Sequence, residues 1–83
     1  MNIYVGNLDF KVNENDLKEI FEEYGAVSSA KIITDKFSGR SKGFGFITMD
    51  DDAEANKAIE GLNGATVESR EIVVNEAKPR KQY

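Results

Sequence analysis

The segment Lys42–Met49, with the sequence KGFGFITM, constrains the fold more than any other part of the chain. Side chains alternate between the two faces of a β-strand, so Phe44 and Phe46 share one face of such a strand. Ile47 and Met49 share the other face, where their apolar character suits a core. The two phenylalanines must then face away from that core. The segment therefore predicts a sheet with one packed face and one open, aromatic face.

Two further segments carry the periodicity of amphipathic helices. The first is expected to begin after Asn13, which forms a variant of the capping box with Asp16, and to end at Gly25. The second is expected to follow the acidic caps at 50–52 and to stop at 63–64. The apolar positions at helical spacing are Leu17, Ile20, Phe21 and Tyr24 in the first segment and Ala55, Ala58, Ile59 and Leu62 in the second.

Alternating or apolar runs predict four strands, so the element order is βαββαβ. This order is that of an α+β, ferredoxin-like sandwich with a four-stranded antiparallel sheet and two helices on one face. We expect one domain over 1–77 and a basic, mobile tail over 78–83. The first strand also turns Tyr4 outward, between inward Ile3 and Val5. The four strands are predicted at 3–5, 27–34, 42–49 and 71–77.

Cysteine and histidine are both absent from the 83 residues. Their absence excludes disulfides and thiolate or imidazole metal sites, and it leaves no paired nucleophile and base. We therefore expect no enzymatic activity, no cofactor and no metal. No apolar run approaches the roughly 20 residues that a membrane helix needs, and a chain without cysteine suits the reducing cytoplasm.

The net charge of -4 argues against a general nucleic-acid binder, which usually has a basic face. The distribution of the charges weakens this objection, because the acids gather on the predicted helices and at 50–52. Segregated charge would let a basic rim attract phosphates. The cations expected near the open face are Lys31, Lys36, Arg40, Lys42, Lys78, Arg80 and Lys81.

Two strand segments resemble the signature segments of the RNA recognition motif family. Residues 42–49 resemble the family's ribonucleoprotein octamer, with Met49 in place of the usual aromatic residue. Residues 3–8 resemble its hexamer, and both segments fall on the strands that the family requires. The match spans essentially the whole chain. Because a strand follows Met1 directly, the chain is similar to the short stand-alone members found in bacteria.

The resemblance implies roles for individual residues. Tyr4 and Phe46 would each stack a base, and Phe44 would pack against the sugars between them. Lys42 would pair with a backbone phosphate, and the exit of the last strand at 75–77 would hydrogen-bond base edges. Ser69 stands where many members have glycine. The residues expected to contact RNA are Tyr4, Asn7, Lys31, Arg40, Lys42, Phe44, Phe46, Asn75, Ala77 and Lys78.

The predicted function is the binding of single-stranded RNA by a monomer, as a small post-transcriptional regulator or RNA chaperone, with weak binding of single-stranded DNA. The alternative is a protein-interaction module on the same fold, in which the aromatic face or the acidic helices grip a partner. The intact set of three exposed aromatic residues argues against this alternative as the main role.

Overall fold

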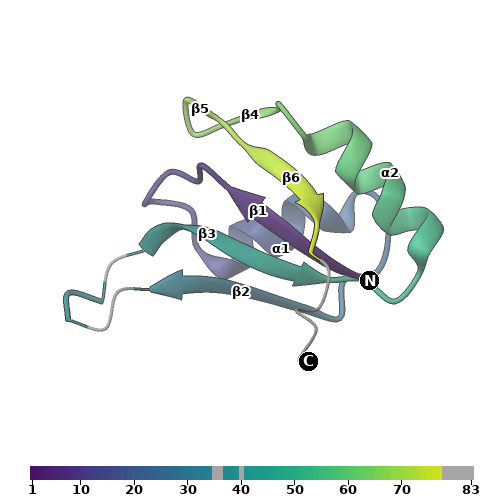
Figure 1. Ribbon diagram of the computed structural model, residues 1–83, viewed down its shortest axis with the longest axis horizontal. Coiled ribbons are helices and arrows are strands. Elements are labelled where there is room, and N and C mark those ends of the chain that lie inside the picture. Colours follow the sequence, from purple (N-terminus) through teal and green to yellow (C-terminus); the bar gives the residue numbers. More distant parts are fainter. Residues whose placement is uncertain (35–36, 40, 78–83) are drawn as a thin grey trace, which may run out of the picture.

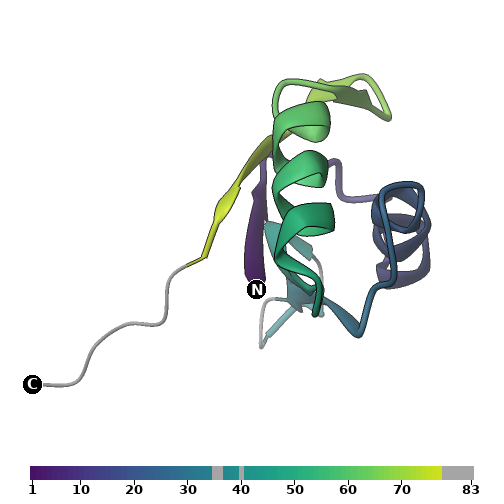
Figure 2. The ribbon, with the colours of Figure 1, turned by 90° about the vertical axis from the view of Figure 1, so that its right-hand side faces the viewer.

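The computed structural model describes residues 1–34, 37–39 and 41–77. Over these residues the main sheet has four antiparallel strands in the order β2-β3-β1-β6. Figure 2 shows that both helices lie on the same side of this sheet. The predicted ferredoxin-like fold is therefore confirmed. The elements that build it are β1 Asn2–Gly6, α1 Glu14–Glu22, β2 Ser29–Thr34, β3 Ser41–Thr48, α2 Asp52–Leu62 and β6 Val73–Glu76 (Figure 1).

The core lies between the sheet and the helices and follows the predicted alternation. Ile47 and Met49 are fully buried, whereas Phe46, which precedes Ile47 and points to the opposite face, is exposed. Ile72 and Val74 also point inward, as predicted. The helices close the core with the residues at their inward positions. The buried apolar set is Ile3, Val5, Leu8, Val12, Leu17, Phe21, Ile32, Ile47, Met49, Ala55, Ala58, Leu62, Ile72 and Val74.

The helix starts agree with the expected caps. The Asn13 side chain accepts a hydrogen bond from the Asp16 N–H at 2.8 Å, and the Asp16 carboxylate accepts one from the Asn13 N–H at 3.3 Å. Asp51 caps α2 by accepting from the Glu54 N–H at 2.9 Å. These bonds satisfy backbone donors that the first turn of a helix leaves unpaired.

The end of α1 differs from the prediction. The helix ends at Glu22, with Glu23 as its C-cap, so the predicted inward residue Tyr24 lies outside it. Gly25 does not have the positive φ that is typical of a glycine ending a helix. Gly25 instead lies against α2, because a β-carbon added there would meet the side chain of Glu54. The Glu54 carboxylate also accepts from the Ala26 N–H at 3.3 Å. The glycine here serves a close approach between segments and does not cap the helix.

A short hairpin after α2 was not predicted. Its strands are β4, Thr66–Val67, and β5, Arg70–Glu71, and they pair with each other. Glu68 and Ser69 connect them with φ values of 51° and 71°. Two consecutive residues with positive φ are typical of a tight hairpin turn, which favours glycine. The strand predicted over 71–77 is thus divided between this hairpin and β6. The tail predicted over 78–83 lies outside the described residues.

Both edge strands of the main sheet have one N–H bound by a side chain from the helical layer. The Glu14 carboxylate accepts from the Ile32 N–H of β2 at 2.9 Å. At the other edge, the Asn63 side-chain oxygen accepts from the Val74 N–H of β6 at 3.0 Å. Each bond occupies a donor that the neighbouring strand leaves unpaired.

Candidate nucleic-acid interface

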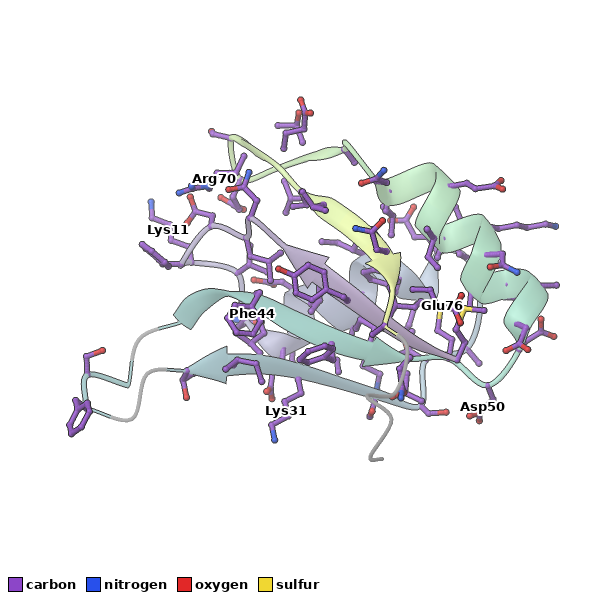
Figure 3. All side chains as sticks on the ribbon, in the orientation of Figure 1. Lys11, Lys31, Phe44, Asp50, Arg70 and Glu76 are labelled. Carbon is purple, nitrogen blue, oxygen red and sulfur yellow. The ribbon has the colours of Figure 1, made fainter. Side chains whose placement is uncertain are left out.

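Tyr4, Phe44 and Phe46 form one aromatic cluster on the face of the sheet opposite the helices. Their ring centroids are 6.1 Å apart for Tyr4 and Phe44, 5.9 Å for Tyr4 and Phe46, and 6.4 Å for Phe44 and Phe46. Tyr4 is directly opposite Phe46 in the register of β1 and β3. Figure 3 shows Phe44 on the side of the sheet that faces away from the helices. The predicted open, aromatic face is therefore confirmed.

The rings remain accessible although they contact one another. Phe46 is 38% exposed, and Tyr4 and Phe44 are partly exposed. Phe46 meets both neighbours edge-on, with interplanar angles of 64° and 88°. Edge-to-face contacts at these separations fix ring orientations. The cluster can therefore offer flat, preoriented aromatic surface to a planar ligand.

Because Gly6 has no side chain, the Tyr4 ring can lie directly over it. Both residues belong to β1 and, being two positions apart, share the open face. A β-carbon at Gly6 would lie 2.9 Å from two carbon atoms of the Tyr4 ring and 2.5 Å from its hydroxyl oxygen. These separations are shorter than an ordinary carbon contact of about 3.5 Å. The glycine after Tyr4 thus lets the ring lie along the strand.

Polar and charged side chains flank the aromatic cluster on the neighbouring strands. Lys31 of β2 is opposite Phe46, and Asn75 of β6 is opposite Tyr4. Both are exposed, and Figure 3 places Lys31 at the β2 edge of the sheet. Ala77 follows β6, and its N–H donates to the Asn2 carbonyl at 2.8 Å. Its amide is thus engaged within the protein, and its carbonyl is the group that could face a base.

Asn7 has its side-chain amide engaged with the β4–β5 hairpin. Its Nδ2 donates to the Glu71 carbonyl at 2.6 Å, and its Oδ1 accepts from Arg70 Nη2 at 3.2 Å. Its backbone has a φ of 56°, a value that asparagine adopts more readily than most residues. This geometry gives Asn7 a positioning role at the end of β1. Arg70 was missed by sequence reasoning because its partner is 63 residues away.

Three predicted contact residues have limited or no structural description. Arg40 and Lys78 lie outside the described residues, as do Lys36, Arg80 and Lys81 of the predicted basic rim. Lys42 belongs to β3 by its backbone. Of the predicted RNA-contacting set, the structure therefore brings together Tyr4, Lys31, Phe44, Phe46 and Asn75 on one face and places Asn7 and Ala77 at strand ends.

Other parts of the surface offer less for a ligand. A hollow of about 420 Å³ lies between the start of α1 and β2, away from the aromatic cluster, and Val12, Glu14 and Ile32 contribute to its lining. Over the described residues there is no group of acidic side chains arranged to hold a metal ion.

Within the same residues, neither helix has the length and apolar character needed to span a membrane.

The family model for the RNA recognition motif matches residues 3–73. The chain therefore belongs to the RNA recognition motif family, a class of RNA-binding domains and not of enzymes. Among its relatives is the "Putative RNA-binding protein RbpA" of the cyanobacterium Synechocystis sp., with 49% identity over 98% of this chain and 80% of that protein. The "28 kDa ribonucleoprotein, chloroplastic" of Spinacia oleracea is 43% identical over 98% of this chain and 36% of that protein.

Solved structures agree with this assignment. The crystal structure of "RNA Binding Protein PG1" superposes with a TM-score of 0.93, with 49% identity over 99% of both chains. A protein–RNA complex titled "SXL-LETHAL PROTEIN/RNA COMPLEX" superposes with a TM-score of 0.90, with 27% identity over 98% of this chain and 48% of that one. The fold therefore matches both a similar small protein and a domain solved together with RNA.

Proposed function

We propose that this chain binds single-stranded RNA on the open face of its sheet. Tyr4 and Phe46 each stack one base, and Phe44 packs against the sugars between them. The observation that carries the proposal is the exposed cluster of three rings on a face that no other described segment covers. Unpaired bases fit this surface because every base has a flat aromatic face. Similar proteins are named for RNA binding, which supports the same ligand.

Single strands are favoured over duplexes by the shape of the face. The rings lie on a broad sheet, where they can stack on bases only if those bases are splayed out of a helix. Lys31 stands beside Phe46 and can meet the phosphate of a base stacked there. Asn75 stands beside Tyr4 and can hydrogen-bond the edge of a base stacked on that ring. The same face would accept single-stranded DNA more weakly, because the 2′-hydroxyl contacts would be lost.

The expected affinity is moderate. Stacking contributes about 1–3 kcal/mol per base, so two stacked bases contribute roughly 2–6 kcal/mol before phosphate and edge contacts are added. A dissociation constant in the micromolar range corresponds to about -8 kcal/mol. Such binding suits a monomeric cytoplasmic protein that acts as a small post-transcriptional regulator or RNA chaperone, a role that requires release as well as capture.

The proposal is tested by fluorescence anisotropy with labelled single-stranded RNA pools at two salt concentrations. Phe46→Ala removes one stacking ring and should weaken binding by about 5- to 150-fold. Lys57→Ala, on the exposed side of α2, is the matched control and should bind as the wild type does. Duplex RNA should bind far more weakly than single strands. If the folded wild type binds no pool below the millimolar range, the proposal fails and a protein partner becomes the better hypothesis.

A further inference from the structure

Asn63 is the only asparagine in the chain that is followed by glycine. In such a pair the glycine nitrogen can attack the carbon of the asparagine side-chain amide, because glycine has no side chain to hinder the approach. The new N–Cγ bond closes a succinimide ring, and the amide nitrogen leaves as ammonia. Water then opens the ring to give aspartate or isoaspartate. Asn63 and Gly64 are both exposed, so water can reach them.

The backbone at Asn63 keeps the two reacting atoms apart. The five-membered ring can close only when the Gly64 nitrogen eclipses the Asn63 β-carbon about the Cα–C bond. Asn63 is the C-cap of α2 and has a ψ of 119°. With tetrahedral geometry at Cα, this ψ leaves the Gly64 nitrogen roughly a third of a turn from the eclipsed position. Ring closure therefore requires a large rotation of the backbone between these two residues.

Two hydrogen bonds to the segment that enters β6 oppose this rotation. The Gly64 N–H donates to the Ile72 carbonyl at 2.8 Å, so the proton that must leave the attacking nitrogen is held by an oxygen. The Asn63 Oδ1 accepts from the Val74 N–H at 3.0 Å, which holds the side-chain amide against β6. Both bonds have to break before the Gly64 nitrogen can reach the amide carbon.

We propose that Asn63 is a deamidation site that the fold keeps unreactive, and that it reacts only when the segment around 63–64 separates from residues 72–74. The co-reactant is water, and no enzyme is required. The folded chain withholds the nucleophile, its proton and the amide from one another, whereas an opened chain leaves all three free to react. The inference does not depend on RNA binding.

The isoaspartate product would not fit back into this junction. In isoaspartate the main chain runs through the former side chain, which adds one carbon atom between residues 63 and 64. Gly64 could then no longer meet Ile72 while the Ile72 N–H donates to the Ala65 carbonyl, as it does now at 2.9 Å. The Val74 N–H would also lose its acceptor. An opening that ends in ring closure would therefore leave the α2–β6 junction permanently altered.

The test measures the rate of deamidation at 63–64 in the intact chain, from the mass gain of the peptide that contains these residues. Native protein is compared with protein unfolded in guanidinium chloride at the same pH and temperature. If both hydrogen bonds must break, the native rate should be slower by about 5- to 150-fold. Asn63→Gln in the denaturant should abolish the mass gain in this peptide, which assigns the reaction to the site.

A pair of matched variants separates local opening from global unfolding. Ile72→Val weakens packing next to the junction, and Ile32→Val makes the same change in β2, at the opposite edge of the sheet. Ile72→Val should speed native deamidation by about 2- to 10-fold, and Ile32→Val should leave it unchanged. Circular dichroism checks that both variants are folded.

Equal rates in the native and the unfolded chain would overturn the inference, because the fold would then give no protection. The absence of a mass gain in the denaturant would overturn it as well, since the pair would not be reactive. Equal acceleration by Ile72→Val and Ile32→Val would show that only global unfolding exposes the site, and the proposed local gate would be wrong.

Discussion

Replacing Gly6 by alanine is expected to weaken RNA binding without removing any atom proposed to touch the RNA. The new β-carbon would lie 2.5–2.9 Å from three atoms of the Tyr4 side chain. Relief to an ordinary contact of about 3.5 Å requires the ring to move by roughly 0.6–1 Å. The tip of an exposed-face side chain can move at little cost to stability, but the stacking position is lost. The expected loss is about 1–3 kcal/mol of binding free energy, or about 5- to 150-fold in dissociation constant.

The assay is a double-mutant cycle with Tyr4→Ala, measured by anisotropy on the same single-stranded RNA. Once the ring is absent, Gly6→Ala has nothing to displace, so it should weaken Tyr4→Ala no further. Thermal unfolding followed by circular dichroism serves as the control, because Gly6→Ala should shift the midpoint only slightly. Wild-type affinity in Gly6→Ala would refute the reasoning. Additive losses in the double mutant would also refute it, since they would place the effect outside the Tyr4 ring.

Three further predictions concern charge and stability. Lys31→Ala should lower the slope of log affinity against log salt by about 0.7 for single-stranded RNA, whereas Lys57→Ala should leave the slope unchanged, as anisotropy titrations across salt concentrations will show. Ser69→Gly should raise the free energy of unfolding, measured by urea titration, by about 0.5–1 kcal/mol. The reason is that Ser69 is held at a φ of 71°, a conformation that has a steric cost for serine and none for glycine. An unchanged or lower free energy of unfolding would contradict this. Asn13→Ala should lower that free energy by about 1 kcal/mol through loss of the α1 cap, and retention of full stability would show that the cap contributes little.

The faces of the strands could be predicted because a strand has a short, strict period. Once Ile47 and Met49 are inward, Phe44 and Phe46 have only one side left, and the structure agrees. The start of α1 could be predicted for a similar reason, since the capping bonds of Asn13 reach only three residues along the chain.

The features that sequence reasoning missed depend on distant contacts or on very short elements. The strands β4 and β5 have two residues each, too few for a period to be recognised. The engagement of Asn7 with Glu71 joins residues that are 64 positions apart. Gly25 could be recognised as a turn residue, but the approach of Glu54 that requires it comes from the other helix.

The bonds that Glu14 and Asn63 make at the two edges of the sheet affect how copies of this chain meet one another. A protein that keeps aromatic rings uncovered for its ligand attracts other copies of itself, and free strand edges would turn such encounters into continuous sheets. With a donor occupied on both β2 and β6, an incoming strand must first break a bond to a side chain. Pairing of two copies through either edge of the sheet would therefore cost one such bond at that edge.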